Sequence, residues 1–422
     1  MKKLKAEIPL LTCFFWYLCP LKMEKKPAFS FDNLETAFAH LSDDDLKKTQ
    51  ALFRLMGYPA LVKMGIWLSK MSFSMGLPLE KVIKDTVFRQ FCGGEHIEAC
   101  KPTVDRLARF GVKSILDYSV EGNKGESSFA AAKEEILQTI QAAKSNENLP
   151  FAVFKASGIV DTGLLTHAQA KEPLSEEMQD SLSMGKDRFM TICEAAFQAQ
   201  VRIMVDGEES WFQGIIDQWV REAMRQFNKE KALVFNTYQL YRKDMLRQLK
   251  DAHHDAVARG YFLGAKLVRG AYMEKEREMA AAKGYPDPIH STKSATDQDY
   301  DRALQFCINN KQRISLVSGS HNEMSNTVLA ELIDLHGLSR ADERVYFSQL
   351  YGMSDPISFN LAKAGFNVVK YLPYGPVKEV LPYLARRAEE NSGISGQTGR
   401  ELKLIKQEIR RRKSLPEFPT IA

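Results

Sequence analysis

The sequence of 422 residues has few cysteines and little net charge, and both shortages narrow the possible functions. Six cysteines lie scattered without a repeated spacing, which argues against a disulfide framework and favours a reducing compartment. The net charge is only +5 and no polybasic stripe occurs, so nucleic acid is not an expected partner. The sequence also lacks a calcium loop, a zinc-hydrolase helix and the common nucleophile and phosphate-loop motifs, and we expect no metal site.

Long hydrophobic runs are also missing, apart from residues 8–21. That run resembles the core of a signal peptide, but lysines rather than a small-residue cleavage site come next, and it is too short to span a bilayer comfortably. We favour a third interpretation, in which Met23 is the true start and residues 1–22 are an uncertain extension. We then expect a cytoplasmic protein, with peripheral contact at the inner membrane left open, or a mitochondrial one if the source is eukaryotic.

Apolar residues make up 44% of the chain, enough to bury a sizeable core. Between residues 32 and 110 they recur at three- and four-residue spacing, which is typical of helices. Ser42, followed by three aspartates, makes a good helix start. We predict a helical arm over residues 23–112.

After Gly111 the pattern changes to short β-branched or aromatic runs that alternate with longer helical stretches. These runs are residues 114–118, 151–155, 201–206, 232–237, 262–268, 314–318, 345–349 and 367–372. Such alternation predicts parallel βαβ units, and we expect an α/β fold in which residues 113–395 form a TIM-type (β/α)8 barrel, followed by a C-terminal helix and tail over residues 396–422. A doubly wound open sheet is the alternative, but no run is followed by a Gly-x-Gly-x-x-Gly turn.

Active sites of this barrel lie where strands end and loops begin. The residues at these points are mostly polar or aromatic and include Lys155, Asp206, 236–239, 266–272, 320–322, Gln349 and Tyr371. Lys155 and Asp206 close adjacent strands and could pair across the barrel mouth. Lys155 could equally be a Schiff-base nucleophile or a plain rim residue, and the pattern alone does not decide.

Two strand ends have features that suit a phosphate. Residues 320–323 read Ser-x-x-Glu, a capping-box pattern whose helix N-terminus would point free N–H groups at the barrel mouth, where His321 could donate or simply pack. Residues 266–272 combine two cations with Gly270 and Ala271, which fits either a phosphate-bearing cofactor or a tight turn. The following residues, 273–300, are expected to form a long loop.

The stretch 371–391 organises the end of the barrel. A strand leads into a Pro-Tyr-Gly-Pro turn, and we expect a helix to begin at Val377. Arg386, Arg387 and Glu390 lie on the side of this helix opposite the apolar residues. Paired guanidiniums can bind a small carboxylate through two hydrogen bonds each, although an ordinary solvated helix face is the alternative.

Several strings in this region together resemble the proline dehydrogenase family. They are KLVRGAYMEKE (266–276), HST (290–292), TDQDYD (296–301), GSHN (319–322), LYGMSD (350–355) and YLPYGPVKEVLPYLARRAEEN (371–391). The resemblance covers residues 31–391 and is stronger to the monofunctional, eukaryote-like branch than to the bifunctional proline utilization A proteins.

This resemblance implies a distorted barrel that binds FAD non-covalently at the strand ends. It further implies oxidation of L-proline to Δ1-pyrroline-5-carboxylate, as part of proline catabolism, by hydride transfer to flavin N5, with electrons passed to a membrane quinone. Hydroxyproline dehydrogenase is a close alternative. A Schiff-base aldolase or lyase using Lys155 is a more distant one.

The resemblance also assigns roles to individual residues. The implied catalytic residues are Lys155, Asp206, Tyr371, Arg386, Arg387 and Glu390. The implied substrate contacts are Tyr272, Leu350 and Tyr383. The implied cofactor contacts are Asn236, Gln239, Lys266, Val268, Gly270, Ala271, Ser320, His321, Asn322 and Gln349. Lys266 replaces an arginine and Asn236 a glutamine of many bacterial members, so a phosphate contact by Lys266 should survive while a bidentate one is in doubt. We expect the Tyr383 hydroxyl to discriminate proline from its 4-hydroxy analogue.

The C-terminal segment 401–413 is expected to form a helix with Leu402, Ile405 and Ile409 on one side and a basic end. Such a helix could lie on an anionic membrane. A capping helix with a solvated basic end is the favoured interpretation, because so short a helix offers little apolar area to a bilayer.

Overall fold

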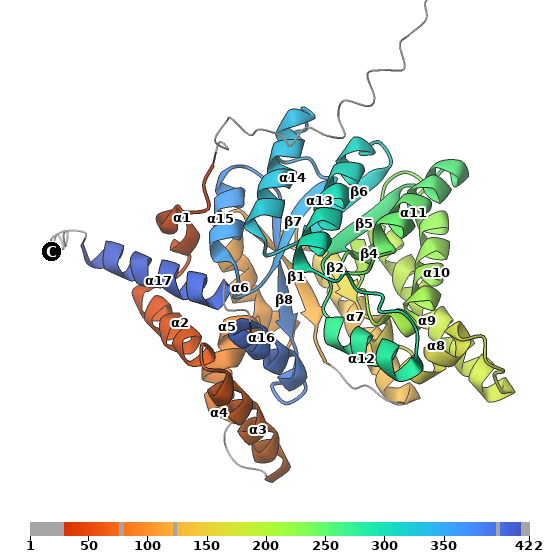
Figure 1. Ribbon diagram of the computed structural model, residues 1–422, viewed down its shortest axis with the longest axis horizontal. Helices are drawn as coiled ribbons and strands as arrows, with labels where there is room; N and C mark the ends of the chain where they lie inside the picture. The colour runs from red at the N-terminus through yellow and green to blue at the C-terminus, as the bar shows by residue number, and fades with distance from the viewer. Residues whose placement is uncertain (1–28, 76–79, 121–124, 394–396, 415–422) are drawn as a thin grey trace, which may run out of the picture.

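The computed structural model describes residues 29–75, 80–120, 125–393 and 397–414, and its centre is a closed barrel of eight parallel strands in sequential order (Figure 1). The strands are β1 (Val112–Tyr118), β2 (Phe151–Phe154), β3 (Arg202–Val205), β4 (Val234–Gln239), β5 (Leu263–Val268), β6 (Ile314–Gly319), β7 (Val345–Leu350) and β8 (Val368–Tyr374). The predicted (β/α)8 fold is confirmed, and every predicted strand is present with ends within two residues of those expected.

Pairing of the last strand with the first closes the barrel and excludes the open sheet. β8 runs parallel to β1 in register from Val112 opposite Val368 to Tyr118 opposite Tyr374. Successive side chains of each strand point to opposite faces, so Phe151 and Val153 of β2 fill the barrel interior while Phe154 packs outward. Both faces are therefore buried, which explains why the strands are nearly continuous apolar runs.

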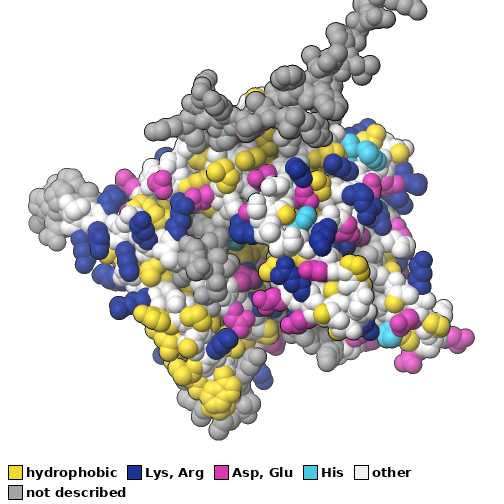
Figure 2. Space-filling model, in the orientation of Figure 1, with side chains coloured by type: hydrophobic (Ala, Val, Ile, Leu, Met, Phe, Trp, Pro, Cys, Tyr) yellow, Lys and Arg dark blue, Asp and Glu magenta, His cyan; other side chains and the backbone are white. Residues whose placement is uncertain are grey.

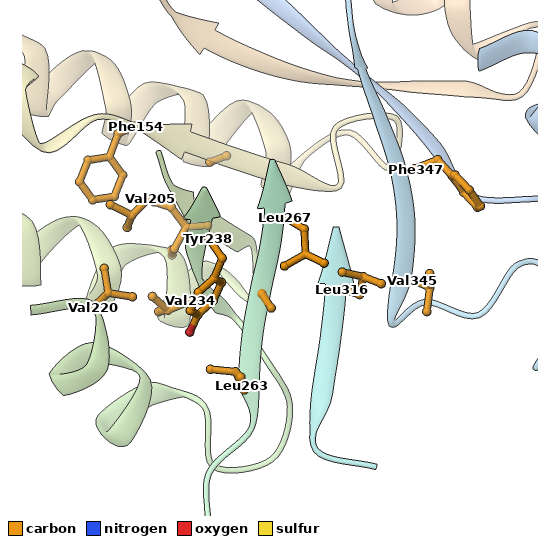
Figure 3. Packing of buried hydrophobic residues seen from close by; sticks show 14 of the residues in the cluster. Phe154, Val205, Val220, Val234, Tyr238, Leu263, Leu267, Leu316, Val345 and Phe347 are labelled. Atoms are coloured by element: carbon orange, nitrogen blue, oxygen red, sulfur yellow. The ribbon is translucent and has the colours of Figure 1, made fainter. Parts of the chain in front are cut away.

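Helices cover the outside of the barrel and bury its main hydrophobic core (Figure 3). They are α7 (Glu126–Lys144), α8 (Thr162–Gln169), α9 (Glu176–Ala199), α10 (Ser210–Phe227), α11 (Met245–Arg259), α12 (Met273–Lys283), α13 (Lys293–Asn309), α14 (Glu323–Leu335) and α15 (Asp355–Lys363), with a 3-10 turn, η3 (Ala156–Gly158), after β2. Packing is close enough that a Cβ on Gly264 of β5 would lie 2.3 Å from the Val234 carbonyl oxygen. Only glycine fits there.

The expected loop over residues 273–300 is wrong, because α12 and the start of α13 occupy it. Thr292 caps α13 by accepting a hydrogen bond from the Ala295 amide at 3.1 Å. Charged residues and small alanines dominate α12, so its apolar period is too weak to identify from the sequence.

Helices before and after the barrel form a second layer. They comprise α1 (Leu34–Phe38), α2 (Asp43–Met56), α3 (Pro59–Met75), α4 (Glu80–Ile83), the π-helix η2 (Lys84–Phe88), α5 (Arg89–Phe91), α16 (Leu381–Gly393) and α17 (Gln397–Lys413). Helix α6 (Ile97–Ala108) instead packs on the barrel and joins its main core. Phe38, Phe53 and Phe91 share a buried cluster with Leu384 and Ile405 of the two last helices. The predicted helices of the arm are present, while α16 begins at Leu381 rather than at Val377 because residues 377–380 form a turn.

The C-terminal helix α17 uses both its apolar side and its basic end within the protein. Leu404 and Ile405 are buried, and Arg412 donates hydrogen bonds to the Phe38 and Leu41 carbonyl oxygens at 2.8 and 3.0 Å. These contacts favour the capping helix over the membrane-lying one. Residues 1–22 and 415–422, for which an extension and a tail were expected, lie outside the described residues. Among the described helices, none combines the length and hydropathy needed to cross a membrane.

Candidate active site

Three side chains from β3, β5 and β8 meet inside the barrel mouth. The Lys266 ammonium donates to Asp206 Oδ1 and to the Tyr371 hydroxyl, each at 2.6 Å, and lies 4.5 Å from the Tyr371 ring centroid. The Tyr371 hydroxyl lies 3.2 Å from the same carboxylate oxygen. This cluster, named here the floor triad, brings together residues separated by up to 165 positions in the chain.

Burial controls the protonation of the floor triad. Lys266 is 6% exposed, and Tyr371 is 5% exposed. Burial, together with the Asp206 carboxylate, raises the pKa of Tyr371 well above its ordinary value, so the phenol stays protonated and can donate. A buried ammonium is costly unless it is paired, and Asp206 supplies that partner. The predicted pairing of Asp206 with Lys155 stays a prediction.

Lys155, at the end of β2, lies beside a second acid that the sequence analysis missed. Burial raises the pKa of Glu208 to about 7, and the nearby Lys155 ammonium opposes that rise. The Glu208 carboxylate accepts a hydrogen bond from the Ser157 amide at 3.0 Å. Burial also raises the pKa of Tyr272, against the charges of Lys155 and Arg386. These couplings place Lys155, Glu208, Tyr272 and Arg386 at the same mouth.

Two amides on β4 take different positions. Asn236 donates to Asp217 at 3.0 Å, and its own Oδ1 is buried without a hydrogen-bond partner among the described residues. Gln239 instead donates to the Glu208 carbonyl oxygen at 2.7 Å and so fixes the loop after β3. Asn236 therefore points away from the barrel interior toward α10, on the same face of β4 as Val234 and Tyr238, and a cofactor contact by it stays a prediction.

The end of β5 has a clear reason for its glycine. Gly270 has a φ of +131°, and a Cβ there would lie 2.5 Å from the Tyr241 ring. The Tyr241 ring therefore fills the space that a side chain at position 270 would need. Of the neighbouring residues, Ala271 is exposed and Val268 is half-buried. The adjacent Arg269 donates to Ser320 and Ser325 at 2.8 and 2.9 Å, which ties the end of β5 to the end of β6.

The β6 loop carries the three residues expected to hold a phosphate. The Ser320 hydroxyl accepts from Arg269 and from the Asn322 amide. Asn322, not Ser320, is the N-cap of α14 and accepts from the Ser325 amide at 3.1 Å, so the predicted capping box is wrong by two residues. Burial and the charges of three nearby cations lower the pKa of His321 to about 3, and its imidazole is therefore neutral.

Two residues of β7 support this loop. Gln349 is 2% exposed, donates to the Ser320 carbonyl oxygen at 3.0 Å and accepts from Ser358 at 2.9 Å. The Leu350 amide lies 3.5 Å from His321 Nε2. Gln349 therefore has hydrogen-bond partners within the protein, and a direct cofactor contact by it remains a prediction.

Helix α16 covers the mouth and carries the paired arginines. Arg387 is 7% exposed, pairs with Glu390 at 2.5 Å and lies 5.2 Å above the Tyr383 ring. Its Nε and the Tyr383 hydroxyl are buried without hydrogen-bond partners among the described residues. The charge of Arg387 acts on His321, and that of Arg386 acts on Tyr272, so this helix faces the strand ends.

The arrangement brings the ends of seven strands, β2 to β8, and helix α16 together at one mouth. Two of its features were missed by sequence reasoning, namely Glu208 and the bridging role of Arg269. Glu208 follows Asp206 by two residues, so the same strand-end rule could have found it. The buried Arg387 Nε and Tyr383 hydroxyl leave two donors for bound molecules, which fits an anionic substrate.

A family model described as proline dehydrogenase matches residues 100–400. The carbapenem antibiotics biosynthesis protein CarD of Pectobacterium carotovorum subsp. carotovorum is 35% identical over 76% of this chain and 83% of its own length. Proline dehydrogenase 1, mitochondrial, of Dictyostelium discoideum is 32% identical over 91% of this chain and 72% of its own. The human protein of the same name is 43% identical over 57% of this chain, but over only 41% of its own length.

Among solved structures, proline utilization A from Bdellovibrio bacteriovorus inactivated by N-propargylglycine superposes with a TM-score of 0.69. It is 18% identical, and the match covers 95% of this chain and 44% of the larger one. This likeness supports the fold, and the family match over residues 100–400 goes further. The chain belongs to the proline dehydrogenase family.

Proposed function

We propose that the protein oxidises L-proline to Δ1-pyrroline-5-carboxylate with bound FAD and passes the electrons to a quinone. The observation that supports the proposal is that the arginines of α16 act electrostatically on Tyr272 and His321 at the strand ends, the same end of the barrel that holds the floor triad. A cationic roof suits the carboxylate of an amino acid, and the polar strand ends suit a cofactor. Mitochondrial relatives support a mitochondrial location if the source is eukaryotic, and peripheral membrane contact fits a quinone acceptor.

Binding of the substrate carboxylate by Arg386 and Arg387 would fix its orientation. Glu390 holds Arg387 through their ion pair, which leaves the unpartnered Nε of that guanidinium available for a ligand. Partial burial raises the pKa of Glu390, against the charges of both arginines, and the pair joins a buried guanidinium to a carboxylate that is 36% exposed. Orientation of a bound substrate accounts for much of the rate enhancement in such reactions.

The cofactor residues are proposed from the same strand ends. Gln239, Lys266 and the loop of Ser320, His321 and Asn322 would hold FAD, with neutral His321 able to donate or accept a hydrogen bond. Bound FAD supplies the hydride acceptor that no side chain offers. The protein contributes the position of the substrate carbon and a mouth closed by α16.

The substrate amine must lose a proton before its adjacent carbon can be oxidised. Asp206 already accepts hydrogen bonds from Lys266 and Tyr371, so its Oδ1 is engaged within the protein. Glu208 has a pKa of about 7, which suits a group that accepts and releases a proton near neutral pH. We therefore favour Glu208, directly or through water, over Asp206 as the acceptor.

Arginine substitution tests the proposed carboxylate site. Arg387→Ala should keep bound flavin but raise the KM for L-proline by about 100-fold, since truncating one partner of a buried charged pair costs about 2–5 kcal/mol. Arg387→Lys should recover part of the loss, and Arg247→Ala, at a 72% exposed side chain, is the matched control. Turnover with an artificial quinone gives KM and kcat. An unchanged KM in Arg387→Ala would refute the assigned role.

A further inference from the structure

Helix α3 presents a row of large apolar side chains to solvent. Met64 is 51% exposed and Trp67 is 60% exposed, and Leu61 precedes them on the same side at three-residue spacing. Tyr58, just before the helix, is 56% exposed. Figure 2 shows hydrophobic side chains gathered at the lower left of the molecule, in the region of α2 and α3. We name this row, Tyr58, Leu61, Met64 and Trp67, the α3 strip.

The exposure does not come from a loosely attached helix. Val62 is 8% exposed and belongs to the second hydrophobic cluster, and Ile66 packs against that cluster. These residues anchor α3 on α2 and α16, which lie beside it (Figure 1), while the side chains of the α3 strip are exposed. The chain thus holds a fixed apolar surface in water, which calls for a partner.

The charges around the strip narrow the choice of partner. Between Pro59 and Met75 the sequence has two lysines, Lys63 and Lys70, and no acidic residue. Lys63 is exposed beside the strip, as is Arg54 near the end of α2. Aromatic rings with a polar edge, such as those of Trp67 and Tyr58, favour the boundary between lipid and water, and lysine stems can lie along apolar surface while the ammonium reaches head groups.

The size of the strip also argues against a second copy of the chain. A helix of 17 residues is about 25 Å long and about 10 Å wide. Its exposed strip therefore covers a few hundred Å², below the roughly 800 Å² that each partner of a stable dimer buries. Shallow insertion into a bilayer needs no more than one apolar helix face with cations beside it.

We propose that the α3 strip docks the protein on a lipid bilayer with anionic head groups. The α3 strip, rather than α17, is the surface that we assign to the membrane, because α17 buries its apolar side within the protein. Helix α3 packs on α16, which carries Arg387, so docking would bring the roof of the candidate site near the bilayer. A lipid-soluble electron acceptor would arrive from there, a consequence that rests on the proposed function.

Vesicle co-sedimentation of the full-length protein tests the docking surface. Wild type should bind vesicles of phosphatidylcholine with phosphatidylglycerol, bind pure phosphatidylcholine more weakly, and lose anionic binding as salt is raised. The variant Leu61→Ser/Met64→Ser/Trp67→Ser should lower the partition coefficient by about tenfold or more. A matched variant at exposed apolar positions of α11 and α14, Val257→Ser/Leu335→Ser, should bind as wild type does.

Equal vesicle binding by wild type and the triple variant would overturn the proposal, as would a wild type that binds neither vesicle. Light scattering tests whether the α3 strip instead binds a second copy of the chain. A wild-type dimer that becomes a monomer in the triple variant, with vesicle binding unchanged, would assign the strip to self-association and would also overturn the proposal. Circular dichroism and proline turnover with a soluble acceptor should match wild type. Because binding is measured without substrate, its failure is distinct from failure of the proposed activity.

Discussion

Replacement of Glu208 by glutamine tests the electrostatics of the barrel mouth most sharply. The carboxyl is 3% exposed, and burial raises its pKa to about 7 from an ordinary 4.5. Below pH 4.5 the group is neutral in both the folded and the unfolded chain. Between 4.5 and 7 the unfolded chain releases this proton while the folded one retains it, so the free energy of unfolding falls as pH rises.

The size of this effect follows from the two pKa values. A rise from 4.5 to about 7 at roughly 1.4 kcal/mol per pKa unit gives a decline of about 3 kcal/mol that is complete above pH 7. Glutamine keeps an oxygen that can accept from the Ser157 amide, but it cannot ionise. Glu208→Gln should therefore gain stability relative to wild type as pH increases, by about 2.5 kcal/mol between pH 5 and pH 8, because a small part of the decline lies below pH 5.

Urea unfolding of wild type and Glu208→Gln at about pH 5, 6, 7 and 8 measures that difference directly. The comparison cancels the contribution of Glu401, whose pKa burial also raises to about 7. Glu147→Gln, at an exposed position, controls for the loss of a carboxylate. A difference between wild type and Glu208→Gln that stays constant with pH would refute the assignment of a neutral, buried Glu208 below pH 7.

Two further predictions concern the floor triad and Tyr383 of α16. Lys266→Met should lower the free energy of unfolding by about 3 kcal/mol, because it leaves Asp206, whose side chain is only 14% exposed, without its cation. Tyr371→Phe should cost about 1 kcal/mol. Similar midpoints for both variants in urea would contradict the ion pair. Tyr383→Phe should barely change stability, because its hydroxyl has no partner among the described residues, and should raise kcat/KM for 4-hydroxyproline relative to L-proline. An unchanged ratio would remove Tyr383 from substrate discrimination.

The strands of the barrel were predictable because each is buried on both faces and therefore reads as a short apolar run, as in β2 and β6. Closure of the barrel buries one face of each strand inside it, and the surrounding helices bury the other. The parallel strands also bring the polar residues that follow them to the same end of the barrel. Helices with weak apolar periods were not predictable, and α12 was expected to be a loop for that reason. The family match removes the aldolase alternative that Lys155 had left open.

The partners of individual side chains could not be read from the sequence. Asp206 pairs with Lys266, whose strand lies two strands away in the barrel. The sequence pattern alone does not show toward which neighbour either side chain points. The same limit applies to Gly270, whose space is filled by Tyr241 from another strand end. The N-cap of α14 at Asn322 depended on where the chain leaves β6, which a capping pattern alone does not fix.

The role of the C-terminal helix shows how tertiary contacts decide between interpretations. Its basic end could have faced a membrane or the protein. Hydrogen bonds from Arg412 to the carbonyl oxygens of α1 and its following turn, together with buried Ile405, join this helix to the arm. The exposed apolar row belongs instead to α3, a helix whose sequence had been assigned to an ordinary arm.

Anaerobic addition of L-proline to the purified protein tests the central claim most directly. We predict that the protein carries a bound flavin whose visible absorbance bleaches with L-proline, that Δ1-pyrroline-5-carboxylate forms in equal amount, and that a quinone restores the colour. A colourless protein, or a bound flavin that L-proline leaves oxidised, would contradict the account.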